Sequence, residues 1–257
     1  MRVAVITPYY NAREDWLAQC HESVRAQTHP STHILVADGT PESYVDGWEA
    51  QHIVLKKNHA DYGDTPRAVG TVSAIGQGFD AIAYLDADNW YAPEHIESLV
   101  KLHDKTGAAV CTSSRNFHRL DGSLMGLCPF SDGETFVDTS CLFLTRKAFR
   151  VAWRWALIPH DLHAIDDRVM WHFVLSAKLT RAHTGRPTMA YRTAFKADYR
   201  AFGEHPPPGA KGNAPVVAAL QSLRQRGGPD LSLPDRPGKS GGRGAATPLR
   251  PPRPRRR

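Results

Sequence analysis

Two hydrophobic patterns alternate along residues 1–112. Short, continuous apolar runs are typical of strands buried on both faces of a sheet, and apolar residues at helical spacing indicate amphipathic helices between them. The runs predict strands over residues 3–6, 34–37, 53–55, 81–85 and 108–111. The spacing predicts helices over residues 14–27, 66–75 and 93–105. Strands that alternate with helices form parallel βαβ units, so this region is expected to be an α/β structure.

After residue 113 the pattern becomes less regular. Residues 113–134 read as loop because they carry the turn signals Asp121-Gly122 and Asp132-Gly133. The remaining pattern predicts short strands over residues 136–137, 141–144 and 188–192, and a helix over residues 167–178. Residues 153–165 are rich in Trp and His and have no regular period. The second half of the chain is therefore predicted only in outline.

The positive charge of the chain is concentrated at its C-terminal end. The 257 residues carry a formal net charge of +6. Residues 206–257 contain 11 Lys and Arg against 2 Asp, a net of +9, so residues 1–205 hold 21 basic and 24 acidic residues, a net of −3. The same end holds 11 of the 19 prolines, and this composition buries too little apolar surface to order a chain. We therefore expect one domain over residues 1–205 and a mostly disordered tail over residues 206–257, with a short helix at 214–224.

Cysteine usage and the length of the apolar runs indicate a cytoplasmic protein. The four cysteines include no Cys-x-x-Cys pair and are expected to be reduced thiols. No apolar run approaches the ~18 residues of a membrane-spanning helix, and the apolar start is too short for a signal peptide. The Arg-rich residues 250–257 suit peripheral contact with the inner face of a membrane. They include no aromatic ring to stack on bases, so no specific nucleic acid partner is expected.

Polar side chains follow the predicted strands at the edge where parallel sheets bind ligands. Asp86 and Asp88 directly follow the apolar run 81–85, and Thr7 and Asp38 follow the first two runs. Two carboxylates two residues apart at a strand end can share one hard cation. Mg²⁺ and Mn²⁺ prefer such oxygen ligands and often bind phosphates as well. The alternative at this point is an Asp-rich turn that caps the next helix.

Four segments, in this order, resemble the motifs of family-2 glycosyltransferases, which have the GT-A fold. The segments are Ile6-Thr7-Pro8-Tyr9-Tyr10-Asn11, Ile34-Leu35-Val36-Ala37-Asp38-Gly39-Thr40, Ala83-Tyr84-Leu85-Asp86-Ala87-Asp88-Asn89 and Ile165-Asp166-Asp167-Arg168-Val169-Met170-Trp171. The resemblance covers about residues 1–195. It implies a Rossmann-like, mostly parallel central sheet flanked by helices. It also implies an enzyme of bacterial polysaccharide or glycoconjugate synthesis that moves a sugar from a nucleoside-diphosphate sugar, UDP-linked, to an acceptor hydroxyl with inversion.

The resemblance further implies roles for individual residues. The nucleotide-binding residues would be Thr7, Pro8, Tyr10, Asp38, Arg67 and Asp86. Asp86 and Asp88 would hold the divalent cation, Mn²⁺ or Mg²⁺. Asp167 would be the general base, a carboxylate that takes the proton of the acceptor hydroxyl from within ~3 Å. The residues alone also allow a second interpretation, in which Asp166 and Asp167 only cap the helix that follows them.

A cluster of aromatic rings and histidines precedes the predicted base. Flat rings can stack on sugar faces, and histidines can form hydrogen bonds with hydroxyls. The acceptor and sugar residues are therefore expected among Trp153, Trp155, His160, His163 and Asp166. The alternative is that both tryptophans belong to the core or to an interface. The acceptor itself, a glycan, a lipid-linked molecule or a small molecule, is left open by the sequence.

Two other functions remain open at this point. A nucleotidyltransferase on a related sheet would need a glycine-rich phosphate loop after the first strand, and residues 7–11 contain no glycine. A non-catalytic protein could use the same fold as a binding scaffold, with the basic tail as its tether to an anionic polymer or membrane.

Overall fold

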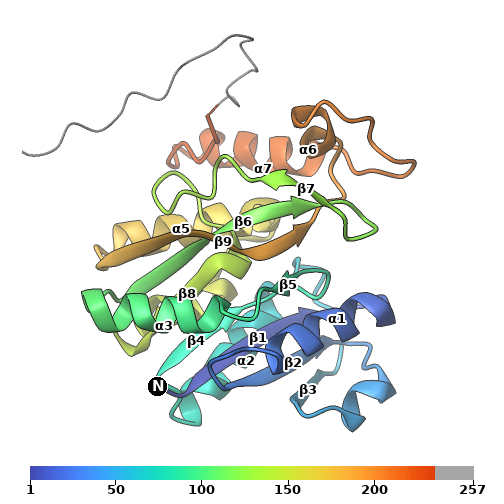
Figure 1. The fold of residues 1–257 in the computed structure, drawn as a ribbon. Helices are drawn as coiled ribbons and strands as arrows, with labels where there is room; N and C mark the ends of the chain where they lie inside the picture. The colour runs from blue at the N-terminus through green and yellow to red at the C-terminus, as the bar shows by residue number, and fades with distance from the viewer. Residues whose placement is uncertain (235–257) are drawn as a thin grey trace, which may run out of the picture.

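A nine-stranded mixed sheet runs through the centre of the computed structural model, which describes residues 1–234 (Figure 1). The strands lie in the order β3-β2-β1-β4-β8-β6-β9-β5, and β7 pairs with β6 beside this path. Their bounds are β1 Val3–Tyr9, β2 Ser31–Asp38, β3 Gln51–Leu55, β4 Ala81–Tyr84, β5 Trp90–Tyr91, β6 Val110–His118, β7 Leu124–Leu127, β8 Leu142–Thr145 and β9 Arg181–Arg192.

The first four strands of the sheet form the parallel part that the apolar runs predict. β1 pairs in parallel with β2 and β4, and β2 pairs in parallel with β3. The register places Ile6 opposite both Ile34 and Tyr84, so the carboxyl ends of these strands reach the same edge. Every residue of β1 is buried, as expected for a strand that is covered on both faces. The predicted α/β fold class is confirmed.

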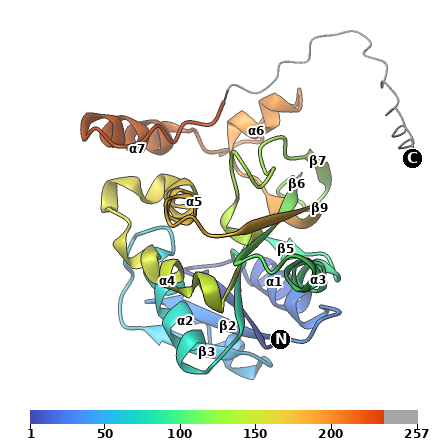
Figure 2. The same cartoon turned by 90° about the vertical axis from the view of Figure 1, so that its left-hand side faces the viewer.

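Helices cover both faces of the sheet. α1 and α3 lie on one face, and α2, α4 and α5 lie on the other (Figure 2). Their bounds, with those of the remaining helices, are α1 Glu14–Arg25, α2 Asp64–Gly76, α3 His95–Thr106, α4 Phe149–Ala152, α5 Asp166–Ser176, α6 Lys196–Ala201 and α7 Ala214–Gln225. α2 approaches β1 so closely that a Cβ on Gly70 would lie 2.6 Å from Cγ2 of Ile6. A glycine is therefore required where this helix crosses the strand.

The second half of the sheet differs from the sequence prediction. Residues 113–134 are not all loop, because β6 continues to His118 and forms an antiparallel pair with β7. Thr112 to Arg115 are buried polar residues in the middle of β6, so the strand lacks the apolar run by which buried strands are recognised. β9 begins at Arg181 instead of residue 188, and residues 136–137 form only an isolated bridge.

Short 3₁₀ turns fill the segment that had no regular period. They are η4 Trp153–Leu157 and η5 His160–Ile165, and the earlier turns of this type are η1 Ser43–Gly47, η2 Thr139–Cys141 and η3 Arg146–Ala148. η4 packs against α2, and η5 leads directly into α5. The turns thus place the predicted acceptor cluster beside α2, with His163 three residues before the start of α5 at Asp166.

α7 packs on the domain at η5 and matches the short helix predicted at residues 214–224 (Figure 1). Its residues Ala219 and Leu223 are buried in the main hydrophobic core. The predicted domain boundary at residue 205 stays a prediction, and the basic run 250–257 lies outside the described residues. Within residues 1–234, no helix is both long and apolar enough to cross a membrane.

Candidate active site

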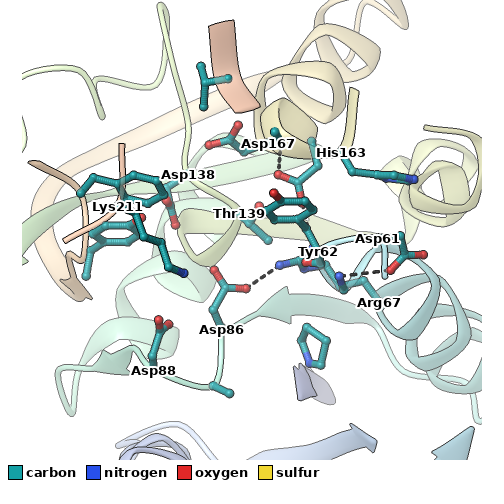
Figure 3. Close-up of a pocket in the computed structure, with 18 of the residues that line it drawn as sticks. Asp61, Tyr62, Arg67, Asp86, Asp88, Asp138, Thr139, His163, Asp167 and Lys211 are labelled. Atoms are coloured by element: carbon teal, nitrogen blue, oxygen red, sulfur yellow. Dashed lines mark hydrogen bonds and ion pairs between the residues drawn. The ribbon is translucent and has the colours of Figure 1, made fainter. Parts of the chain in front are cut away.

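A cavity of about 1020 Å³ lies at the carboxyl ends of β1, β2 and β4 (Figure 3). Its other walls come from the loop before α2, from the start of α5 and from segments after β9. The cavity brings together nine of the residues predicted from the sequence: Pro8, Tyr10, Asp38, Arg67, Asp86, Asp88, His163, Asp166 and Asp167. The edge of a parallel sheet where ligands bind is thus lined by most of the predicted site.

Arg67 connects the two sides of this cavity. It lies in the first turn of α2, and its side chain is 5% exposed. Its guanidinium donates to Oδ1 of Asp86 at 2.7 Å (Figure 3). It also donates to Oδ2 of Asp166 at 3.0 Å. Cζ of the guanidinium lies over the ring of Trp155, 5.2 Å from its centroid. One buried cation therefore holds the carboxylate after β4 and the carboxylate at the start of α5 in a fixed relation.

A second buried contact connects the same two regions. Nδ1 of His163 and Oδ2 of Asp64 lie 2.5 Å apart, within hydrogen-bonding distance. Burial raises the pKa of Asp64 to about 7, although nearby Arg67 opposes this shift. Burial also lowers the pKa of His163. Asp64 was not among the predicted site residues, but it holds the imidazole of His163, which was among them.

Asp166 and Asp167 occupy the first turn of α5, where the helix dipole favours negative charge. Oδ1 of Asp166 accepts from the amide of Asp167 at 2.7 Å. Burial, together with the charge of Asp166, raises the pKa of Asp167 to about 6. Burial raises the pKa of Asp166 as well. Asp167 lines the cavity, so its carboxyl lies where a bound molecule could reach it.

Asp86 and Asp88 provide an oxygen-only donor set. Burial and the neighbouring charge of Asp86 raise the pKa of Asp88 to about 7. A hard divalent cation would relieve this repulsion, and Mg²⁺ and Mn²⁺ suit carboxylate oxygens. Within residues 1–234, no group of three or more His, Cys, Asp or Glu side chains forms an all-protein metal site. The residues therefore fit a cation that takes its other ligands from water and phosphate.

Asp38 is held by the loop that follows β3. Its carboxylate accepts from Nδ2 of Asn58 at 3.1 Å and from the amide of His59 at 3.0 Å, and Nδ1 of His59 lies 2.6 Å from it. The next residue, Gly39, has φ +91° and passes so close to Asn58 that a Cβ would lie 2.3 Å from its amide nitrogen. The Asp-Gly pair is thus required by the turn that brings Asp38 to the cavity.

The sequence model of glycosyl transferase family 2 matches residues 4–137, which is more than half of the chain. The chain belongs to glycosyl transferase family 2. Solved structures give a consistent result for the fold. The structure of S. aureus TarS 1–349 in complex with UDP has a TM-score of 0.58 at 14% identity, over 78% of this chain and 63% of that chain. The predicted family and GT-A fold are confirmed.

Two further structures of the same S. aureus protein are similar. TarS 1–349 in complex with UDP-GlcNAc has a TM-score of 0.56 at 13% identity, over 75% of this chain and 59% of that chain. The crystal structure of S. aureus TarS has a TM-score of 0.56 at 14% identity, over 78% of this chain and 38% of that chain. The family 2 chain thus spans less than two thirds of each of these three TarS chains. No curated protein matches its sequence.

Four predicted residues of the family 2 chain do not line the cavity. Thr7 is fully buried, and its Oγ1 lies 2.8 Å from Nε2 of His33, because successive side chains of a strand point to opposite faces. Trp155 is also fully buried, under Arg67 and against Tyr84. Trp153 and His160 lie on the outer surface of the 3₁₀ turns.

The structure adds residues that the sequence analysis of this family 2 chain missed. Loops and the 3₁₀ turn η2 contribute Asp61, Tyr62, Asp138 and Thr139, and the C-terminal segment, residues 206–234, contributes Lys211 (Figure 3). Strand β6 contributes Arg115. Arg115 and Asp138 form a buried ion pair. The acidic stretch at residues 61–64 was a readable signal, because it follows a strand and precedes a helix. Nothing in the sequence around Lys211 indicated a site residue.

Proposed function

We propose that this family 2 chain transfers a sugar from a nucleoside-diphosphate sugar, UDP-linked, to an acceptor hydroxyl with inversion. The observation that carries the proposal is the shared cavity: Asp86 and Asp88 line one side, Asp167 lines the other, and Arg67 connects the two. The S. aureus TarS structures with UDP and UDP-GlcNAc support this class of donor.

The donor would bind at the carboxyl ends of the parallel strands. Pro8, Tyr10 and Asp38 line the part of the cavity that suits a nucleoside, and Asp86 and Asp88 would hold Mn²⁺ or Mg²⁺. The bound cation would supply positive charge to the diphosphate. Tyr10 is half exposed, so its ring is available to stack on a flat ligand.

Transfer would begin at Asp167. Its carboxylate takes the proton of the acceptor hydroxyl as that oxygen attacks the anomeric carbon on the face opposite the diphosphate. The bond between the anomeric carbon and the diphosphate oxygen breaks, and its electron pair leaves with the diphosphate. A glycoside, a nucleoside diphosphate and protonated Asp167 result. A pKa of about 6 leaves Asp167 mostly ionised at neutral pH and still able to accept a proton.

Thermal-shift and transfer measurements test the proposal. UDP, GDP, dTDP and CMP are compared with and without Mn²⁺, and release of the free diphosphate from the matching donor is then followed. Mn²⁺-dependent stabilisation by UDP, together with donor turnover, supports the proposal. Stabilisation by none of the four nucleotides would favour a non-catalytic scaffold. Release of pyrophosphate from a nucleoside triphosphate would favour a nucleotidyltransferase.

A further inference from the structure

The C-terminal segment forms one wall of the cavity. It contributes five lining residues: Lys211, Asn213, Val216, Leu233 and Pro234. Arg226, the residue directly after α7, forms an ion pair with Asp161 in η5, and Arg168 in α5 donates to the carbonyl of Leu231 at 3.1 Å. These contacts attach the segment to η5, which carries His163, and to α5, which carries Asp167.

The backbone of Lys211 is fixed independently of these contacts. Its amide donates to the carbonyl of Ala194 at 2.7 Å, and its carbonyl accepts from the amide of Lys196 at 2.9 Å. Both partners lie within four residues of the end of β9 at Arg192, and Lys196 is the first residue of α6. Nε of Arg192 in turn donates to the carbonyl of Asp88 at 3.1 Å. A short chain of hydrogen bonds therefore sets the backbone of Lys211 relative to the turn that carries the two metal-binding carboxylates.

Most other cations at the cavity already have carboxylate partners. Arg67 is paired with Asp86 and Asp166, and Arg115 is paired with Asp138. Arg13 is likewise paired with a neighbouring aspartate. Within residues 1–234, Arg168 has no such ion pair, but it supports the C-terminal segment through Leu231, and burial lowers its pKa.

Lys211 differs from these arginines. No carboxylate within residues 1–234 forms an ion pair with it, and its ammonium extends into the cavity towards the side of Asp86 and Asp88 (Figure 3). It is an exposed side chain on a flexible stem, with three donors that can turn towards a ligand.

A nucleoside diphosphate brings two or more negative charges to a cavity that already contains several carboxylates. One divalent cation offsets only part of this charge. The leaving diphosphate gains further negative charge as its bond to the sugar breaks, and positive groups placed there stabilise that charge. We propose that Lys211 binds the diphosphate of the donor and stabilises it as the leaving group, an inference that rests on the proposed function above.

Isothermal titration of Lys211 variants tests this role. Wild type, Lys211→Ala and Lys211→Arg are titrated in Mn²⁺ with UDP, GDP and dTDP, and with the nucleoside of whichever diphosphate binds wild type. We expect Lys211→Ala to bind that diphosphate about tenfold more weakly, which is the loss of a hydrogen bond to a charged group. Its affinity for the nucleoside should not change, and Lys211→Arg should stay within about threefold of wild type because it keeps the charge.

Lys196→Ala is the matched control. It removes the same charge from a residue hydrogen-bonded to Lys211 through the backbone, but its side chain does not line the cavity. It should bind the diphosphate as wild type does. Equal diphosphate affinity in wild type and Lys211→Ala overturns the role of Lys211 and leaves the proposed donor class intact. Failure of wild type to bind any of the three diphosphates overturns the donor class, and the role of Lys211 with it.

Discussion

The two halves of the molecule build their parts of the cavity in different ways. Residues 1–112 place Pro8, Asp38 and Asp86 through the common register of parallel strands, so the topology alone brings them to one edge. Residues 113–234 place Asp167 and Lys211 through particular hydrogen bonds and ion pairs between short elements. The proposed donor side thus follows from the fold, whereas the proposed catalytic side depends on individual contacts.

Charged contacts join the halves across the cavity. Arg67 comes from the first half and contacts Asp166 in the second, and Asp64 contacts His163 in the same way. These groups are almost fully shielded from water, where a broken pair is costly. These contacts are therefore expected to restrict the movement of Asp86 relative to Asp167 more than short turns alone would. Substitutions on the two sides should give different kinds of functional loss.

The largest effect is expected for Asp167→Asn. The variant keeps the shape of the side chain but cannot accept the proton, so transfer should fall by about 10²- to 10⁴-fold. Affinity for the donor diphosphate should stay within about twofold. Donor turnover and diphosphate titration measure the two quantities, with Asp104→Asn, at an exposed residue of α3, as the matched control. A normal transfer rate in Asp167→Asn would show that another group is the base.

Asp88→Asn removes the same charge from the other half and should give the opposite pattern. We expect diphosphate affinity in Mn²⁺ to fall by more than about tenfold, because the cation loses a carboxylate ligand. In EDTA the variant and wild type should bind the diphosphate alike. The fold should not be weakened, since burial already raises the pKa of Asp88 to about 7. An unchanged response to Mn²⁺ would place the metal elsewhere.

Arg67→Met tests the connection between the halves. It leaves Asp86 and Asp166 without their buried cation, and breaking a buried ion pair in this way costs about 3–5 kcal/mol. Arg146→Met is the control, because its pair with Asp80 is largely exposed and is worth about 0–1 kcal/mol. Urea unfolding measures both free energies. Equal losses in the two variants would mean that packing, not charge, joins the halves.

The contrast between the halves also explains how much could be predicted. Buried parallel strands leave continuous apolar runs, so β1, β2, β3 and β4 and their ligand-binding edge could be predicted from residues 1–112 alone. β6 has polar residues from Thr112 to Arg115 in its centre, which are buried against neighbouring strands, and it was therefore read as loop. The hydrophobic pattern shows which side chains are apolar, but it does not show which polar side chains are buried with hydrogen-bond partners.

The site residues follow the same rule. The position of Asp86, Asp88 and Asp167 at the cavity could be predicted because their motifs lie at the ends of predictable elements. Thr7 belongs to such a motif too, but the alternation of the strand turns its hydroxyl towards His33. Lys211 could not be predicted, since its place depends on backbone contacts with Ala194 and Lys196 that no local pattern encodes.

A smaller effect is expected for the dependence of the transfer rate on pH, which tests the role of Asp167 in the second half. Burial and Asp166 raise the pKa of Asp167 to about 6. A base works only when deprotonated, so the transfer rate should rise as pH increases through 6 and then level off. Below that pH it should fall about tenfold per unit. Asp167→Asn should lack this step, and Asp104→Asn should keep it. A flat wild-type profile between pH 5 and 7.5 would contradict the assignment.

The smallest effect is expected for Trp153→Ala. Trp153 is 42% exposed and does not line the cavity, so its loss should change the free energy of unfolding by no more than about 0.5 kcal/mol. The KM for the acceptor should stay the same. Trp155→Ala is the comparison, because removing this fully buried side chain should lower the free energy of unfolding by about 3–5 kcal/mol. A raised acceptor KM in Trp153→Ala, with unfolding unchanged, would instead support the predicted sugar contact and extend the acceptor site beyond the cavity, onto the outer surface of η4.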